Sequence, residues 1–378
     1  MGACASAPVY EGPHKQVVVI GGGFGAIATA KALVAGKSQI GVTLVSPLDY
    51  LDISWGTPRG LVEPNTAARQ VVPYSKIFPS GKIAHKQNKA AKVTATHVVT
   101  DSGEELPYDQ LVIATGSVYG PDSEAAILKP ETGVGANRVE EIKALGSKIA
   151  TSKGVLIIGA GLSGIEMAGE IAFTYPNVPV KLVCSDEAIG VKFPKSVAEG
   201  VTKELAKLPN LQVIYSTKAS KADSEKYGCD LCFLTTGLKP VTGFLKDGVL
   251  SDAVDDFGYV GTTPELTVRD HPNIFAIGDC AYPGIFLNAP RGTMSGYQTV
   301  EACKATLVPN VIRALAGKPL KGVNAGKAGG VMTVHKKAGF GYMDKFVIPA
   351  FIVRSMKCPD AFREKTWKDF TGAKPPTA

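Results

Sequence analysis

The sequence predicts an α/β fold that contains two Rossmann-like dinucleotide-binding domains. Two glycine-rich turns carry this prediction, GGGFGA at residues 21–26 and GAGLSG at residues 159–164. Each turn follows a short run of β-branched residues and opens an alanine-containing helical stretch, which is the strand–turn–helix context that the fingerprint requires. Because the complete context occurs twice, we expect two dinucleotide sites rather than one.

Residues 17–20 (VVVI) predict the first strand, and the turn after it predicts a pyrophosphate site. Gly21 makes the tight turn, Gly23 lets the backbone approach the phosphates, and Ala26 is small enough for close packing of helix on strand. The first N–H groups of the helix have no partner within it and attract the phosphates. The cofactor-binding candidates are the residues of the turn: Gly21, Gly22, Gly23, Phe24, Gly25 and Ala26.

Residues 41–46 (GVTLVS) predict the second strand, whose end carries a ribose-binding acid in the Rossmann pattern. Ser46 occupies that position, and Asp49 follows three residues later. The sequence leaves the ribose contact open, and Ser46 is a cofactor-binding candidate at this strand end. Arg59, in the loop region after the strand, is a further candidate.

A hairpin and two buried strands follow. Alternating residues 92–99 and the turn at 101–103 (DSG) predict the hairpin. Residues 108–116 predict a strand ending at Thr115 and Gly116, and residues 273–281 predict one ending at Gly278 and Asp279. Glycine permits close approach of a cofactor, and a carboxylate can accept hydrogen bonds from the hydroxyl groups of a polyol such as the ribityl chain of FAD. These four residues are also cofactor-binding candidates.

The second fingerprint predicts another pyrophosphate site, with Gly159, Gly161 and Gly164 in the same three roles. The next predicted strand, at residues 180–186, lacks an acid at the position that would reject a 2′-phosphate, although Asp186 follows at once. Use of both NADH and NADPH is therefore open. A strand ending in TTG at residues 231–237 repeats the ATG ending of the first half.

The cysteines and histidines predict neither a disulfide framework nor a metal site. Seven cysteines, an odd number, are widely spread, which is typical of reduced thiols. Cys229 and Cys232 have the CxxC spacing of a redox dithiol, but the spacing runs into a strand whose alternate side chains face opposite ways. The five histidines show no metal-ligand spacing with one another or with the cysteines.

Composition and charge indicate a globular chain with a basic end. Apolar residues make up 45% of the chain and charged residues 20%, and no segment is expected to span a membrane. The net charge is +7, and residues 313–378 contain 13 Lys and Arg against 4 Asp and Glu, so the preceding 312 residues carry about −2. A basic region with interleaved aromatic residues suggests contact with anionic lipid or nucleic acid, the alternative being a solvated surface.

The N-terminal sequence MGACAS matches the pattern for N-myristoylation of Gly2, with Cys4 as a palmitoylation candidate. Two acyl chains, or one chain with a basic patch, hold a protein firmly on a membrane. An ordinary tail of small residues is the alternative.

The ordered set GGGFGA, ATG, GAGLSG, TTG and GDCA resembles the two-dinucleotide-binding flavoprotein reductases. Within them, residues 164–171 (GIEMAGEI) and the MGxxxS start resemble an apoptosis-inducing-factor-like branch related to the type II NADH dehydrogenases. The resemblance covers nearly the whole chain and implies an FAD domain interrupted by an NAD(P)H domain. Its implied divisions are a lipid-anchored tail at 1–14, FAD at 15–120 and 245–320, NAD(P)H at 121–244, and a quinone- and membrane-proximal region at 321–378.

The resemblance also implies an activity on the cytosolic face of a membrane. A hydride passes from NAD(P)H to FAD, and a membrane quinone such as ubiquinone is then reduced to a radical-trapping quinol. Glu166 resembles the glutamate that orients the nicotinamide, and Lys327 resembles a lysine near the flavin. A plain helix acid and a solvated lysine are the respective alternatives.

Two other functions would use the same glycine motifs. A soluble reductase of monodehydroascorbate or a ferredoxin needs no acylated N-terminus. A nucleic-acid-binding flavoprotein would use the basic C-terminal region without turnover. The quinone reductase is the leading hypothesis, and strongly salt-dependent DNA affinity without quinone activity would support the nucleic-acid-binding alternative.

Overall fold

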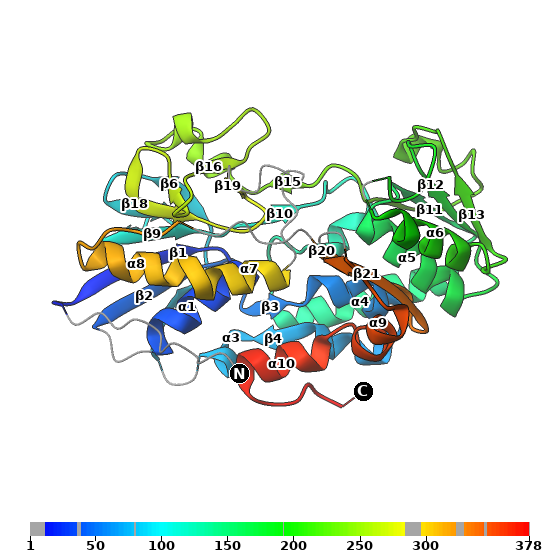
Figure 1. Cartoon of the computed structure of the whole chain (residues 1–378), viewed down its shortest axis with the longest axis horizontal. Coiled ribbons are helices and arrows are strands. Elements are labelled where there is room, and N and C mark those ends of the chain that lie inside the picture. The colour runs from blue at the N-terminus through cyan, green and yellow to red at the C-terminus, as the bar shows by residue number, and fades with distance from the viewer. Residues whose placement is uncertain are drawn as a thin grey trace.

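The computed structural model describes residues 12–35, 39–78, 81–191, 193–283, 296–322, 329–343 and 346–377. Two mainly parallel sheets, each flanked by helices, form two lobes that lie side by side (Figure 1). The predicted α/β class with two Rossmann-like units is therefore confirmed.

The first lobe is built on the larger sheet, and β1 lies in the middle of its parallel part. β1 pairs in parallel with β2 on one side and β9 on the other, and β9 pairs in parallel with β18. The buried run Val17–Ile20 explains this central position, because a strand covered on both faces reads as a continuous apolar run. The described strands follow the order β19 (Ala281–Pro283), β16 (Val260–Thr262), β17 (Thr267–Val268), β18 (His271–Ala276), β9 (Gln110–Ile113), β1 (Lys15–Ile20), β2 (Ile40–Val45) and β5 (Ala84–Lys86).

Helices cover one face of this sheet and a small meander covers the other (Figure 1). The helical layer consists of α1 (Phe24–Ala35), α7 (Gly296–Ala302), a π-helical turn (Cys303–Leu307) and α8 (Val308–Leu315). The meander consists of β6 (Ala90–Val93), β7 (His97–Thr100) and β8 (Glu105–Pro107). It includes the predicted hairpin, and the DSG turn joins its last two strands.

The second lobe repeats the strand–turn–helix unit. Its four described strands are all parallel, with β11 paired to both β12 and β14. Two short strands, β10 (Ser117–Val118) and β15 (Lys239–Pro240), pair antiparallel where the chain crosses out of the first lobe and back. The elements of the second lobe are α4 (Gly135–Ala150), β11 (Val155–Ile158), α5 (Leu162–Thr174), β12 (Val180–Val183), α6 (Lys195–Leu205), β13 (Leu211–Ile214) and β14 (Leu231–Leu234).

The segment after β2 links the lobes, which the sequence did not predict. Leu61, Val62 and Ala67 belong to the first half of the chain, yet they pack in the apolar core of the second lobe with Ile142 and Ile165. This segment contains β3 (Tyr50–Asp52), α2 (Thr57–Val62), a 3₁₀ helix (Pro64–Gln70), β4 (Val71–Pro73) and α3 (Tyr74–Ile77). Shorter 3₁₀ turns occur at Ser54–Gly56, Glu124–Leu128, Lys221–Asp223, Gly243–Leu245 and Ser251–Ala253.

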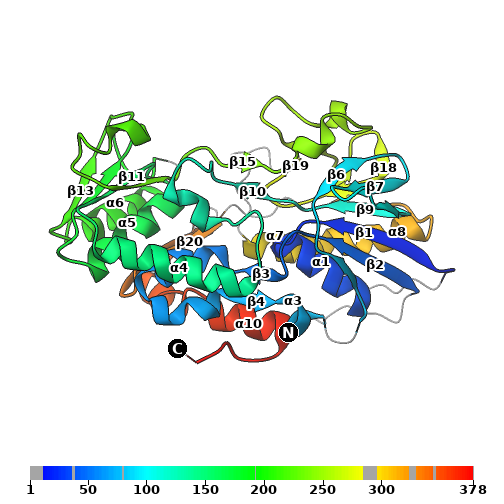
Figure 2. The same ribbon diagram turned by 180° about the vertical axis from the view of Figure 1, so that it is seen from behind.

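The C-terminal region packs against both lobes. β20 lies so close to α5 that a Cβ atom at Gly169 would sit 1.9 Å from the carbonyl oxygen of Val334. The last helix instead lies beside α3 in the first lobe (Figure 2), where Trp367 joins the core. The elements are β20 (Gly329–His335), β21 (Ala338–Met343), β22 (Phe346–Ile348), α9 (Ala350–Met356) and α10 (Arg363–Thr371). Among the described residues, no helix is both long and apolar enough to cross a bilayer.

Candidate functional site

The first glycine turn has the shape that a pyrophosphate site needs. Gly21 has φ +124°, and a Cβ atom there would lie 2.2 Å from the carbonyl oxygen of Ala114 at the end of β9. A Cβ atom at Gly23 would meet no described atom within 4 Å. The turn is therefore closed toward the neighbouring strand and open on the side where α1 begins, which is where phosphates bind.

Ser46 lies against this turn at the end of β2. Its side chain is fully buried, and its Oγ atom is 3.3 Å from the hydroxyl oxygen of Tyr74. The Tyr74 hydroxyl donates to the carbonyl oxygen of Gly22 at 2.9 Å, and burial raises the pKa of this phenol. Asp49 instead accepts a hydrogen bond from the N–H of Gly135 at 2.8 Å. Ser46 is thus positioned at the turn, whereas Asp49 caps the start of α4.

Phe24 and Arg59, two further cofactor-binding candidates, both contact other residues of the chain through their side chains. The Phe24 ring stacks on Trp55 with ring centroids 4.2 Å apart and meets Phe370 edge-on. Arg59 is 2% exposed and makes a bidentate pair with Glu170, with N···O distances of 2.9 and 2.6 Å. Its third nitrogen donates to the Cys358 carbonyl oxygen at 2.9 Å. Arg59 therefore connects α2 with α5 and with the C-terminal region.

The ends of β9 and β18 meet beside the first turn. Thr115 has a buried Oγ1 atom that makes no hydrogen bond to an oxygen or nitrogen of any described residue. Gly116 and Gly278 have positive φ angles of +69° and +85°, and an added Cβ at either would have at most one atom near, at 3.8 Å. A buried hydroxyl that has no oxygen or nitrogen partner among the described residues, next to open glycines, fits a ligand with hydrogen-bonding groups, as FAD has.

Asp279 follows Gly278 and is held by Ser117 and Lys129, which lie on the segment that leads from the first lobe to the second. Ser117 donates to its Oδ2 atom at 2.9 Å, and Lys129 forms an ion pair with the same oxygen. Lys129 also donates to Ser117 at 2.8 Å. No motif in the sequence indicated Lys129, because its link to Asp279 spans 150 residues. These contacts fix the carboxylate at the end of β18.

Thr235, the residue after β14, stabilises the second glycine turn. Its hydroxyl contacts the carbonyl oxygens of Ile158 at 3.0 Å and Gly159 at 2.9 Å. A Cβ at Gly164 would lie 1.9 Å from the Gly159 carbonyl oxygen, whereas one at Gly161 would meet no described atom within 4 Å. Like the first turn, the second turn is closely packed on one side, at Gly164, and open on the other, at Gly161. It therefore also fits a pyrophosphate.

Glu166 is the residue of α5 to which two residues of the C-terminal region, Thr333 and Lys357, donate hydrogen bonds. The side chain is on the first turns of α5 and is 6% exposed. Its Oε1 atom accepts from the Lys357 ammonium at 2.7 Å and from the N–H of Thr333 at 2.9 Å. Lys357 also donates to the carbonyl oxygen of Val331 at 2.7 Å. No described residue donates to the Oε2 atom of Glu166, so this oxygen can accept a hydrogen bond from a ligand.

Lys357 was missed by sequence reasoning, which selected Lys327. Lys327 lies outside the described residues, as do the acylation candidates Gly2 and Cys4. Lys357 is separated from Glu166 by 191 residues and belongs to no recognisable motif. Only its position after α9, in a strongly basic region, could have suggested it.

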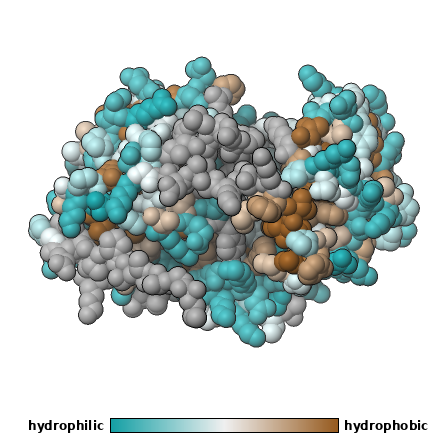
Figure 3. All heavy atoms as spheres, in the orientation of Figure 1, coloured by the Kyte–Doolittle hydropathy of each residue, from teal (hydrophilic) through white to brown (hydrophobic). Residues whose placement is uncertain are grey.

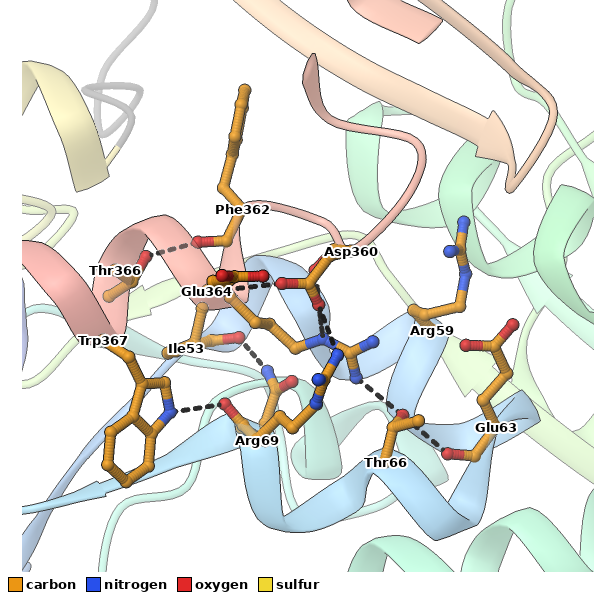
Figure 4. A network of polar contacts seen from close by, with 12 residues as sticks. Ile53, Arg59, Glu63, Thr66, Arg69, Asp360, Phe362, Glu364, Thr366 and Trp367 are labelled. Atoms are coloured by element: carbon orange, nitrogen blue, oxygen red, sulfur yellow. Dashed lines mark hydrogen bonds and ion pairs between the residues drawn. The ribbon is translucent and has the colours of Figure 1, made fainter. Parts of the chain in front are cut away.

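A polar network holds the chain after Lys357 in place (Figure 4). The Trp367 indole donates to the carbonyl oxygen of Arg69 at 3.0 Å, and Arg363 donates to Thr66 at 2.8 Å. Phe362 and the residue before it have left-handed backbones, with φ of 59° and 50°. Figure 4 shows the Phe362 ring pointing away from the polar network. Left-handed non-glycine residues are costly and concentrate at functional sites.

Residues of the segment 118–131, together with Lys239 of β15, line a cavity of about 200 Å³. Tyr119, Lys129 and Lys239 are among its lining residues. The Tyr119 hydroxyl donates to Ser163 of the second turn at 3.0 Å, and burial raises the pKa of this phenol. The cavity lining thus includes Lys129, which holds Asp279, and Tyr119, which contacts the second glycine turn.

The CxxC pair lies inside the second lobe. Both Cys229 and Cys232 are buried in one small apolar cluster, contrary to the expected opposite faces, because β14 begins only at Leu231. Burial raises the pKa of both thiols, which disfavours the reactive thiolate. The described residues contain no group of three or more His, Cys, Asp or Glu placed to hold a metal ion.

Comparison with known proteins gives matches over most of the chain. The family described as "Pyridine nucleotide-disulphide oxidoreductase" matches residues 15–305. Ferroptosis suppressor protein 1 of Xenopus laevis is 30% identical over 382 residues, covering 94% of this chain and 95% of that protein. The Homo sapiens protein of the same name is 26% identical over 388 residues, covering 95% and 97%. The structure of a sulfide:quinone oxidoreductase from Aquifex aeolicus has a TM-score of 0.69 at 20% identity, covering 96% of each chain, and thus shares the fold.

Proposed function

Because this chain belongs to the pyridine nucleotide-disulphide oxidoreductase family, we propose that it is an FAD-dependent NAD(P)H oxidoreductase whose electron acceptor is a membrane quinone. FAD and NAD(P)H are its cofactors, as in the family. The quinone is supported by the full-length similarity to ferroptosis suppressor protein 1 and by the fold shared with an enzyme whose name specifies a quinone. The observation that carries the proposal is the buried ion pair of Glu166 with Lys357, beside the second glycine turn.

We assign the first turn and the strand ends beside it to FAD. Gly21, Gly23 and the N–H groups of α1 hold the pyrophosphate, while Thr115 and Asp279 offer polar contacts to the rest of the cofactor. When bound, FAD accepts a hydride from NAD(P)H and passes the electrons to the acceptor. The proposed divisions remain FAD at 15–120 and 245–320, NAD(P)H at 121–244, and the acceptor near 321–378.

We assign the second turn and Glu166 to NAD(P)H. Gly159 and Gly161 hold the pyrophosphate at the start of α5. Glu166 lies on α5, five residues after Gly161, which precedes the helix, and its free Oε2 atom accepts a hydrogen bond from the nicotinamide carboxamide. The Lys357 ammonium and the Thr333 N–H hold the other oxygen, so the carboxylate has one defined orientation.

Lys357 gives the site a cation that is 6% exposed at its side chain. A cation at low exposure interacts strongly with negative charge that develops nearby, because little water screens it. The ammonium group can hydrogen-bond a quinone oxygen and supply a proton as that oxygen becomes negative. In this proposal, Lys357 takes the role that the sequence suggested for Lys327.

The membrane location is also part of the proposal. Ubiquinone-like acceptors reside in lipid, so the enzyme must work at a membrane surface. Acylation at Gly2, with Cys4 as a second site, would hold it on the cytosolic face.

Anaerobic stopped-flow absorbance tests the proposal in two steps. NADH or NADPH should bleach the flavin, and a short-chain ubiquinone analogue should then restore its absorbance rapidly. Bleaching without recovery by quinone would refute the acceptor while keeping the oxidoreductase.

Two variants separate the proposed roles of the ion pair. Glu166→Gln should slow bleaching at least tenfold while FAD content is kept, since the nicotinamide loses its carboxylate partner. Lys357→Met should slow reoxidation by quinone more than bleaching. Lys337→Met, at an exposed position in the β20–β21 turn, is the matched control and should change neither step. Equal rates in Glu166→Gln and the native protein would return Glu166 to a structural role.

A further inference from the structure

We propose that Tyr119 couples the two cofactor sites, because it orients Ser163 toward the pyrophosphate of NAD(P)H and lies on a segment that also holds Asp279 of the FAD site. We call residues 117–129 the crossover segment, since they lead from the first lobe to the second. Figure 3 shows a notch in the outline of the molecule between the two lobes, on the side where Figure 1 draws β10 and β15. On this side, the crossover segment is a direct covalent route from one site to the other.

The two ends of the crossover segment hold Asp279. Ser117 donates to its Oδ2 atom at 2.9 Å, and Lys129 forms an ion pair with the same oxygen. No described residue donates to the Oδ1 atom of Asp279, so this oxygen can accept a hydrogen bond from a hydroxyl group of FAD. A displacement of the crossover segment therefore moves a residue of the FAD site.

The middle of the crossover segment is attached to the second lobe. The Ser123 hydroxyl oxygen accepts from the N–H of Leu234 at 3.1 Å, and the Glu124 carboxylate accepts from the N–H of Cys232 at 3.3 Å. Both donors belong to β14. The Tyr119 side chain is buried in the apolar core of the second lobe. The crossover segment therefore moves with the second lobe while its ends hold a residue of the first.

The Tyr119 hydroxyl fixes the direction of Ser163 in the second glycine turn. Ser163 is the second residue of α5, and the first N–H groups of a helix bind phosphates. Its Oγ atom accepts from Tyr119 at 3.0 Å, and no described residue accepts from the Ser163 hydroxyl. A serine hydroxyl has one donor hydrogen and two acceptor lone pairs. With Tyr119 on its acceptor side, Ser163 keeps its hydrogen for a phosphate oxygen.

Tyr119 also lies close to one carboxylate of each cofactor site. Burial raises the pKa of Tyr119, and the carboxylates of Asp279 and Glu166 raise it further. The phenol therefore keeps its proton at neutral pH and remains a donor. Hydrogen bonds that run in a chain, from Tyr119 through Ser163 to a phosphate, strengthen one another by polarisation. Bound NAD(P)H thus fixes the crossover segment more firmly, and the coupling of the two affinities is reciprocal.

This inference deepens the proposed function and rests on its assignment of the first turn to FAD and the second to NAD(P)H. It requires no particular electron acceptor. ADP-ribose is a suitable probe, because it carries the pyrophosphate without the nicotinamide and cannot reduce the flavin.

Calorimetric titration of the FAD-loaded protein with ADP-ribose tests the orientation of Ser163. Ser163→Ala should bind ADP-ribose about tenfold more weakly, because a hydrogen bond to a charged group is lost. Tyr119→Phe should bind it at least about threefold more weakly, because Ser163 loses its orienting donor. Tyr108→Phe is the matched control. The buried Tyr108 hydroxyl donates to the Thr94 carbonyl oxygen at 2.6 Å in the first lobe, so this variant should bind as the native protein does.

The double variant Tyr119→Phe/Ser163→Ala separates orientation of Ser163 from general support of the fold. If Tyr119 acts through Ser163, the double variant should bind ADP-ribose as weakly as Ser163→Ala alone, and no more weakly. In flavin bleaching, Tyr119→Phe should raise the NADH concentration that gives the half-maximal rate and leave the maximal rate unchanged. Native affinity in Tyr119→Phe, or losses that multiply in the double variant, would overturn the inference.

A second measurement needs no variant. The release of FAD from the native protein after dilution, followed by the rise in flavin fluorescence, should be slowed at least about fivefold by saturating ADP-ribose. Tyr119→Phe should remove this effect, and Tyr108→Phe should keep it. A release rate of the native protein that does not respond to ADP-ribose would refute the coupling.

These measurements use no quinone, so they separate this inference from the proposed acceptor. If the variants behave as expected while a ubiquinone analogue fails to reoxidise the flavin, the coupling stands and the quinone acceptor fails. If the native protein binds no ADP-ribose, the assignment of the second turn and this inference fail together.

Discussion

The buried pair of Arg59 and Glu170 makes the most demanding prediction, because it supports Lys357 indirectly. Arg59 holds Glu170 with two nitrogens, and its third nitrogen donates to the Cys358 carbonyl oxygen at 2.9 Å. The residue after Lys357 is thereby fixed to α2 and α5. We expect Arg59→Met to destabilise the protein and to displace the Lys357 ammonium from Glu166.

The magnitude follows from burial. The two side chains are 2% and 1% exposed, so water cannot compensate for the loss of one partner. Removing one member of such a pair costs about 3–5 kcal/mol, whereas replacing both with apolar residues is often neutral or stabilising. The double variant Arg59→Met/Glu170→Met should therefore recover most of the stability. It still leaves the Cys358 carbonyl without its donor, which costs about 1–3 kcal/mol.

Urea unfolding followed by circular dichroism, at a fixed excess of FAD, measures the first effect. Stopped-flow reoxidation by a short-chain quinone measures the second. Arg59→Met should lose stability and reoxidation rate together, and the double variant should regain stability while its reoxidation stays slow. Recovery of both in the double variant would show that the Arg59 bond to Cys358 does not position Lys357. A loss of less than about 1 kcal/mol in Arg59→Met would refute the burial argument.

Three other changes test separate parts of the structure. Gly161→Ala should raise the KM for NAD(P)H at unchanged Tm, because the added Cβ meets no described atom within 4 Å and projects where the proposed cofactor would lie. Gly164→Ala should also lower the Tm, because its Cβ would lie 1.9 Å from a carbonyl oxygen. Equal Tm changes in the two variants would contradict this reasoning. Burial lowers the pKa of His335 below 6.5, so its contribution to stability is present above pH 6.5 and is lost as the pH falls. His335→Phe should therefore flatten the fall in Tm from pH 7 to 5, and an unaltered slope would exclude His335 as the source. Trp367→Phe should cost about 1–3 kcal/mol in thermal unfolding by leaving the buried bond to the Arg69 carbonyl unmade, and an unchanged Tm would argue that α10 is held without it.

The predicted strands and helices of both Rossmann units agree with the structure because their signals are local. A β-branched run followed by a glycine turn specifies a strand and a helix N-terminus within about ten residues. The first strand was placed at residues 17–20 and is β1, and the run at residues 155–158 is β11. The segment at 50–78 carries no such periodicity, since Pro58, Gly56 and Gly60 interrupt it, and its helices were not predicted.

Some residues of the candidate site could also be predicted from local sequence, and others could not. Glu166 could be selected because it follows a glycine turn at fixed spacing. Lys129 and Lys357 could not, because lysines are common in this chain and nothing near either one in the sequence distinguishes it. Each acquires its partner only when segments 150 and 191 residues apart meet.

The sequence by itself determined the α/β class, the two glycine turns and the family resemblance, since these depend on backbone geometry over a few consecutive residues. Tertiary structure decided that Arg59 holds the C-terminal region, that Lys357 is the cation beside Glu166, and that Tyr119 contacts the second glycine turn. Burial and charge pairing depend on which distant segments pack together. That packing is set by the shapes of whole elements and leaves no short pattern in the chain.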